Sequence, residues 1–199
     1  MSLITCVCEK SFEVDLPEFV DLSTSPDTYE HIFDGTFLNF ICPQCGYTVK
    51  PEEPIRIIDP SRDIDIFLVP ERERNAFLLG RTAYQTAGRI VIGYPELVEK
   101  LKIYEALLDD GAVEVIKYYL LAKAGAGITP KIMFKGCEEN ELQFDIIGLR
   151  EDEVGKARIP RELYDKLLTE LPSKRREDPY SSILEPPYVS ITKVEIEES

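Results

Sequence analysis

Two short pairs of cysteines constrain this chain more than any other feature of its sequence. Cys6 and Cys8 lie near the N-terminus, and Cys42 and Cys45 follow after 33 intervening residues in the stretch Cys42-Pro43-Gln44-Cys45-Gly46. Four thiolates from two such turns can form the tetrahedral ligand set of a structural zinc site, which keeps no open coordination position. The spacing therefore predicts a fold held together by zinc at Cys6, Cys8, Cys42 and Cys45. It predicts a metal rather than a reaction.

The two cysteine turns fit this purpose unequally. In the second turn, Pro43 fixes one backbone angle and Gly46 accepts a positive φ without steric cost, so that backbone amides can point at the sulfurs. The first turn has one residue between its cysteines where a zinc knuckle has two, and Glu9 follows in place of glycine. Two alternatives therefore stay open: a degenerate site that loses metal on purification, and a set of plain buried thiols.

Two further residues are weighed as site candidates. His31 is the single histidine and could replace a cysteine as ligand, but it lies inside a predicted short helix. Cys137 lies in a predicted turn among acidic residues, which raise the pKa of a thiol, and one histidine leaves few candidate bases for it. We expect Cys137 to be an exposed free thiol rather than a nucleophile.

Composition limits the classes of partner and the compartment. The 199 residues include 37 acidic and 23 basic side chains, a net charge of −14 that repels phosphate backbones and anionic membrane faces. The sequence contains no apolar run long enough to span a membrane and no signal-peptide pattern at its start. We therefore expect a cytoplasmic protein, with a protein rather than a nucleic acid as partner. In a reducing compartment, close cysteine pairs favour zinc over disulfides.

Hydrophobic periodicity predicts an α+β fold in three parts. These are a zinc-ribbon-like β domain with an added hairpin over 1–94, a helical hairpin over 95–125 that breaks at Asp109-Asp110-Gly111, and a small α+β module over 126–199. Gly125-Ala126-Gly127 is expected to be a flexible joint, and 172–187, which has four prolines, a mobile loop. The expected strands are 2–5, 11–16, 37–41, 47–49, 55–58, 64–69, 89–93, 131–135, 141–149 and 188–196; the expected helices are 26–34, 71–79, 95–108, 113–124 and 161–171.

The chain resembles the CpXC family of bacterial proteins. The resemblance rests on two cysteine pairs around a short helix, on the segment 34–39 before the second pair, on the hairpin 58–70 and on the helical stretch 107–110, and it covers roughly residues 3–125. It implies a bacterial source and metal binding through Cys6, Cys8, Cys42 and Cys45. The first motif departs from the family pattern because it lacks a proline and one residue. The resemblance implies no established activity, and it does not extend to 126–199.

Three classes of function remain. The leading hypothesis is a non-enzymatic structural or protein-interaction module, because no phosphate loop, nucleophile elbow, dinucleotide fingerprint or histidine pair is present. The rival is a carboxylate-metal-dependent hydrolase or nuclease, in which a break at Gly111 would bring two acidic pairs together. The third is a nucleic-acid-binding ribbon protein that uses the basic run 174–176. The four acids of the rival reading are Glu105, Asp109, Asp110 and Glu114.

Overall fold

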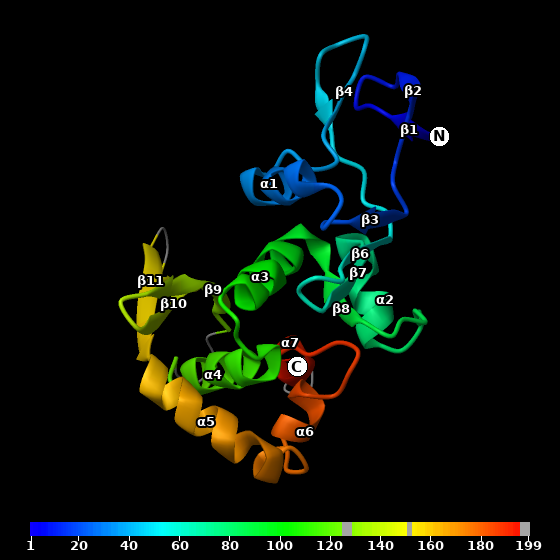
Figure 1. Ribbon diagram of the computed structural model, residues 1–199. Helices are drawn as coiled ribbons and strands as arrows, with labels where there is room; N and C mark the ends of the chain where they lie inside the picture. Colours follow the sequence, from blue (N-terminus) through cyan, green and yellow to red (C-terminus); the bar gives the residue numbers. More distant parts are fainter. Residues whose placement is uncertain (125–128, 151–152, 196–199) are drawn as a thin grey trace. The chain divides into compact units, whose positions relative to one another are not determined.

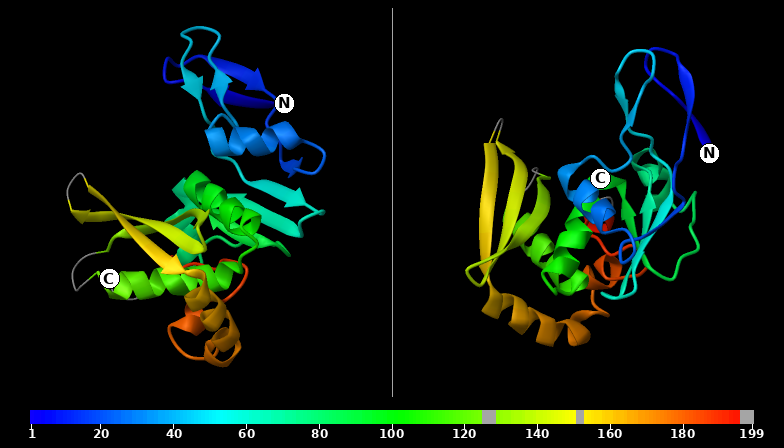
Figure 2. Two further views of the ribbon diagram at one scale, coloured as in Figure 1. Left: turned by 60° about the vertical axis from the view of Figure 1, so that its left-hand side comes forward. Right: turned by 45° about the horizontal axis from the view of Figure 1, so that its top comes forward.

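The computed structural model describes residues 1–124, 129–150 and 153–195 (Figures 1 and 2). The chain forms two compact units, Met1–Val98 and Glu99–Ser199. Both units contain helices and strands, so the predicted α+β class is confirmed. The predicted division at residues 94 and 125 concerns parts that fold independently, and it stays a prediction. No helix in the described ranges has the length and apolar character needed to cross a membrane.

The first unit carries two small hairpins, each of which turns through one cysteine pair. Strands β1 (Ser2–Thr5) and β2 (Ser11–Val14) pair antiparallel around the first cysteine turn. Strands β4 (Phe40–Ile41) and β5 (Thr48–Val49) pair around the second. The strand expected from Phe37 is shorter than predicted, because the chain turns at Leu38, whose φ is +63°. Both halves of the predicted ribbon are present.

A helix separates the two hairpins in sequence. Helix α1 spans Pro26–Asp34, as predicted, with proline in its first turn and Gly35 at its C-cap with φ of +82°. That left-handed conformation is one that glycine adopts without a Cβ penalty, so Gly35 ends the helix.

A mixed four-stranded sheet forms the core of the first unit. Its order is β3-β6-β7-β8, where β3 is Phe19–Asp21, β6 Ile55–Asp59, β7 Ile64–Val69 and β8 Arg89–Ile92. The β6–β7 pair is the predicted hairpin, while β3–β6 and β7–β8 are parallel. Ile55, Ile57 and Ile66 are fully buried. Between β7 and β8 the chain forms a 3-10 turn η1 (Glu71–Glu73) and helix α2 (Arg74–Leu78), close to the predicted helix.

The predicted helical hairpin is present with one correction. Helix α3 spans Gly93–Glu105 and α4 spans Asp110–Ala122, so Asp110 and Gly111 lie in the second helix rather than in the break. The side chain of Asp109 accepts a hydrogen bond from the Ala112 amide at 2.7 Å and so caps α4. The turn itself runs through Leu107, whose φ is +53°.

The second unit packs helices against a three-stranded antiparallel sheet, in the order β11-β10-β9. These strands are β9 (Lys131–Glu138), β10 (Glu141–Arg150) and β11 (Glu153–Pro160), and the helices that follow are α5 (Arg161–Lys174), α6 (Tyr180–Ile183) and α7 (Thr192–Glu195). Phe134 and Phe144 stack edge to face in the core with ring centroids 5.6 Å apart.

Two predictions for this unit are wrong. A strand is expected over 188–196, but residues 192–195 form helix α7. Ile191 and Val194 are both buried, and their spacing of three residues is that of one face of a helix. The expected loop 172–187 instead contains the last turn of α5, which continues past Pro172, and helix α6. The glycine joint predicted at 125–127 lies outside the described residues, as does residue 196.

Candidate metal centre

The first cysteine turn is closed by the backbone and by one residue in a left-handed conformation. The Cys6 amide donates to the Lys10 carbonyl at 2.9 Å, and the Glu9 amide donates to the Cys6 carbonyl at 2.9 Å. Glu9 has a φ of +67°, which is the region that glycine occupies in a standard knuckle. The missing residue and the missing glycine are thus accommodated by backbone strain at Glu9.

The second cysteine turn has the geometry that its sequence predicts. The Cys42 amide donates to the Tyr47 carbonyl at 2.9 Å, and the Gly46 amide donates to the Cys42 carbonyl at 3.0 Å. Gly46 has a φ of +74°. Glu9 and Gly46 therefore perform the same backbone role in the two turns.

The two turns bring all four thiols together. The Sγ atoms of Cys6 and Cys45 are 3.6 Å apart, and those of Cys8 and Cys42 are 3.7 Å apart. All four sulfurs lie within 4.8 Å of one another. Zn–S bonds of about 2.3 Å in a tetrahedron require sulfur–sulfur separations of about 3.8 Å. The four cysteines could therefore bind a metal ion, and their donor set and spacing fit zinc.

The pKa values of Cys42 and Cys45 are shifted in opposite directions. Burial opposes ionisation of Cys42, but amides of its own knuckle and thiols of the first knuckle outweigh it and lower the pKa of Cys42 to about 6. The Tyr47 amide lowers the pKa of Cys45, but the neighbouring thiols and burial raise it to about 12. One thiolate is thus stabilised by protonated neighbours, so a metal that takes all four sulfurs has to displace protons.

His31 and Cys137 take no part in this cluster. His31 is exposed on α1, and within the described ranges the close group of potential ligands contains only the four cysteines. Cys137 is exposed on β9 rather than in the following turn, which begins at Glu139. Burial raises the pKa of the Cys137 thiol, and the charge of Arg161 offsets this in part.

The four carboxylates considered for a catalytic metal do not converge. Glu105 ends α3 and is exposed, and Asp109 caps α4, so the two do not share one continuous helix. Asp110 pairs with Lys100 at 2.9 Å, and both side chains are almost fully buried. Glu114 accepts from Lys117 at 2.9 Å and from the Ile191 amide at 2.9 Å. Asp109, Asp110 and Glu114 therefore have structural partners in the second unit.

Sequence reasoning missed the partners in this buried network. Lys117 also donates to Glu99 at 3.1 Å, and Glu99 accepts from the Phe134 amide at 2.6 Å. Burial raises the pKa of Glu99, whereas the two carboxylates outweigh burial and raise the pKa of Lys117. The available signal was weak, because Glu99 and Lys117 are charged residues on amphipathic helices, where such residues are usually solvated.

The basic run lies at the end of α5. The Lys174 ammonium pairs with Glu170 at 2.9 Å, while Arg175 and Arg176 are exposed. Near this end of α5 the hydroxyls of Tyr119 and Tyr180 are 3.1 Å apart.

Comparison with known proteins shows the family to which the chain belongs. Residues 4–117 match the family described as CpXC protein. An uncharacterized protein of Treponema pallidum (strain Nichols) is 25% identical in an alignment that covers 84% of this chain and 87% of that protein. No solved structure matches the chain. The match takes in both cysteine pairs, the four-stranded sheet and most of the helical hairpin, so the chain belongs to the CpXC family.

Proposed function

We propose that the chain is a zinc-binding, non-enzymatic protein in which Cys6, Cys8, Cys42 and Cys45 hold one structural zinc ion. The observation that carries the proposal is the approach of the four sulfurs, within 4.8 Å of one another across two hairpins. Thiolate sulfur is a soft ligand that favours zinc over magnesium or calcium. The requirement for thiolates also favours a reducing compartment such as the cytoplasm.

The small size of the two hairpins explains why they need a structural metal ion to hold them together. Strands β4 and β5 contain two residues each, and an isolated two-stranded hairpin is marginally stable at best in water. Cys6 and Cys42 are buried, but Ile41, Tyr47 and Val7 around them are exposed. With so little apolar burial, metal coordination would supply much of the free energy that folds this region.

A four-thiolate site supports a structural role rather than catalysis. Catalytic zinc sites keep a position open for water or substrate, and a four-cysteine site has none. Of the four carboxylates that could have formed a second metal site, Asp109 caps a helix, Asp110 and Glu114 form buried ion pairs, and Glu105 is exposed.

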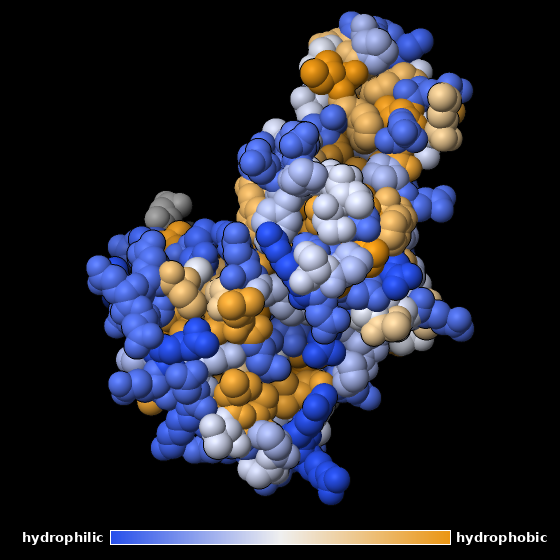
Figure 3. Space-filling model, in the orientation of Figure 1, coloured by the Kyte–Doolittle hydropathy of each residue, from blue (hydrophilic) through white to orange (hydrophobic). Residues whose placement is uncertain are grey.

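The surface around the cysteine turns supports a protein-interaction role. Val7 lies between the first two cysteines, Ile41 precedes the third, and Tyr47 follows the second turn; they are 75%, 71% and 52% exposed. Figure 3 shows hydrophobic residues gathered over these hairpins. Exposed apolar side chains held in place by a rigid site are suited to contact with another protein.

Metal analysis tests the proposed structural zinc site. Protein purified anaerobically should contain about one zinc ion per chain, and cobalt exchanged for the zinc should show the strong visible absorption of tetrahedral cobalt thiolates. Cys45→Ser should lower the metal content and weaken that absorption, whereas Cys137→Ser should leave both unchanged. If Cys137→Ser had the same effect as Cys45→Ser, or if the wild type took up neither metal, the proposed site would be wrong.

Capture of a partner tests the interaction role. Val7→Asp and Ile41→Asp should each abolish capture of a protein that binds the wild type, and both variants should keep their metal. Leu107→Asp is the matched control, because Leu107 is an apolar side chain of the second unit that is 87% exposed. If the captured material were nucleic acid and binding fell steeply with salt, the nucleic-acid alternative would replace this proposal.

A further inference from the structure

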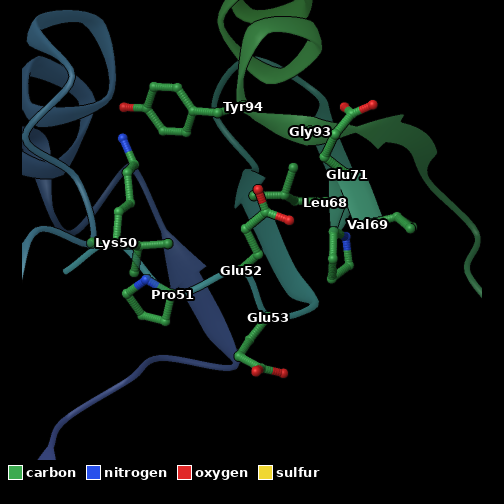
Figure 4. A pocket seen from close by; sticks show the side chains of 11 residues that line it. Lys50, Pro51, Glu52, Glu53, Leu68, Val69, Glu71, Gly93 and Tyr94 are labelled. Atoms are coloured by element: carbon green, nitrogen blue, oxygen red, sulfur yellow. The ribbon is translucent and has the colours of Figure 1, made fainter. Parts of the chain in front are cut away.

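The first unit contains a cavity that the cysteine site does not use. It has a volume of about 150 Å³ and lies where the parallel strands β7 and β8 end, with Val69 and Gly93 in its wall (Figure 4). The segment from Lys50 to Glu53, which directly follows β5, forms the opposite side. Ligand sites in open sheets with parallel strands are commonly found outside the carboxyl ends of those strands.

The floor of the cavity is apolar. Leu38, Leu68 and Val69 line it and are at least nine-tenths buried, and Pro51 and Pro70 add further carbon surface. A cavity of about 150 Å³ lined by apolar side chains can hold a molecule of about the size of benzene. The cavity therefore suits a small molecule with a short hydrocarbon part.

The charged groups at the rim are mostly engaged already. The Lys50 ammonium lies 3.4 Å from the centre of the Tyr94 ring and donates to the Gly35 carbonyl at 3.1 Å. The Glu71 carboxylate accepts from two nitrogens of Arg74, at 2.5 and 2.9 Å. Lys50 and Glu71 are thus held in place by other parts of the first unit.

Glu52 is the charged rim residue best placed to meet a ligand. Its carboxylate reaches toward Leu68, whereas the carboxylate of Glu53 points away from the centre of the cavity (Figure 4). The Glu52 carboxylate accepts a long hydrogen bond, 3.4 Å, from the Arg72 amide, and the Arg72 guanidinium donates to the backbone carbonyl of Glu52 rather than to its carboxylate. A carboxylate at the edge of an apolar floor attracts a cation that carries an alkyl chain.

We propose that this cavity binds a small primary alkylammonium ion, with the ammonium at the Glu52 carboxylate and the alkyl chain on Leu38 and Leu68. Arg74 already balances the charge of Glu71, and Arg72 lies 3.5 Å from the Glu53 carboxylate, so Glu52 is the carboxylate that favours a cation over an anion here. A divalent metal ion fits poorly, because Glu52 offers one carboxylate and within the described chain only the cysteines form a close ligand group.

Titration with n-butylammonium, followed by amide chemical shifts in NMR spectra, tests the proposal. Saturable shifts should appear at Glu52, Leu68 and Gly93 with millimolar affinity. Butan-1-ol has the same alkyl chain without the charge, and butanoate carries the opposite charge. Each should bind about tenfold more weakly than butylammonium, because each loses one charge-assisted hydrogen bond. Equal binding of butan-1-ol, stronger binding of butanoate, or no saturable shift with butylammonium would overturn the proposal.

Two neighbouring glutamates provide a matched pair of variants. Glu52→Gln should weaken butylammonium binding about tenfold, and Glu53→Gln, with the same change of charge, should alter it less than about twofold. Glu52→Lys should reverse the preference, so that butanoate binds more tightly than butylammonium. Both residues are exposed, so the variants should keep fold and metal content. If Glu52→Gln and Glu53→Gln weakened binding equally, the effect would come from general charge and the proposed ammonium position would be wrong.

Discussion

Single residues in the second unit show how this acidic chain places charges inside its core. Lys117 lies between Glu99 and Glu114, and each of these carboxylates also accepts a backbone amide from a separate segment. Burying such groups costs desolvation energy, which ion pairing repays only when the geometry is good. We expect the arrangement to contribute more to fixing which segments meet than to net stability.

The cost of leaving a buried charge without its partner can be measured at the pair of Asp110 and Lys100. Asp110→Asn removes the charge that balances a buried ammonium, so the free energy of unfolding should fall by about 3–5 kcal/mol. Asp109→Ala removes only the cap of α4 and should cost about 1 kcal/mol. Urea denaturation followed by circular dichroism measures both. Asp165→Asn, in an exposed pair with Arg161, is the control and should change stability by less than about 0.5 kcal/mol. A loss below about 1 kcal/mol for Asp110→Asn would show that Lys100 is solvated.

The same residues show what could and could not be predicted about single side chains from the sequence. The cysteines were identified because thiols at short spacing have few uses, and the structure brings Cys6, Cys8, Cys42 and Cys45 together. Asp110 and Glu114 are candidate ligands of a catalytic metal in the sequence, whereas the structure buries both of them in ion pairs. Nothing local distinguishes a buried carboxylate from an exposed one, because burial depends on partners such as Ile191, which lies 77 residues from Glu114.

At the scale of elements, the junction between β8 and α3 depends on one glycine. Gly93 has a φ of +74°, and a Cβ at this position would lie 2.2 Å from an oxygen of Glu71. That carboxylate cannot move freely because Arg74 holds it through two hydrogen bonds. Arg74 in turn pairs with Glu96 of α3 at 2.7 Å. The turn from strand to helix therefore requires both a left-handed backbone and an absent side chain.

Alanine substitutions separate these two requirements. Gly35→Ala meets open space and should cost only the backbone strain, about 1–2 kcal/mol. Gly93→Ala adds the clash with Glu71 and should cost more, by roughly 1 kcal/mol or above. Thermal or urea denaturation compares the two variants, and Glu71→Ala should recover part of the loss in the Gly93→Ala background. Equal losses at Gly35 and Gly93 would mean that the Glu71 side chain simply moves aside.

The predicted helices and strands match the structure where several features of the local sequence indicate the same element. Helix α1 matches in full because Pro26 and Gly35 mark both ends, and the β6–β7 hairpin matches because its apolar residues alternate. Strand β11 was missed because Glu153–Pro160 is polar and one face of it is exposed. Helix α7 was read as a strand because four residues are too few to show a helical period.

At the scale of the whole molecule, the metal should stabilise one unit more than the other. The main buried cluster of the second unit is built from residues between Ile103 and Val194, and it contains no cysteine. The cysteine site lies wholly within Met1–Val98. Loss of the metal therefore removes a constraint on the first unit without removing any contact from that cluster.

Hydrogen exchange after Cys45→Ser tests this separation. We expect amides of β1, β2, β4 and β5 to lose their protection, because neither hairpin buries enough apolar surface to persist without the metal ion. Amides of α4, β9 and β10 should exchange at the wild-type rate, since unfolding confined to one cooperative unit leaves the other protected. Cys137→Ser, which changes a thiol of the second unit, should preserve protection in the hairpins. If Cys45→Ser instead increased exchange uniformly through α4 and the β9–β11 sheet, the chain would unfold as a single unit, and the metal would stabilise all of it.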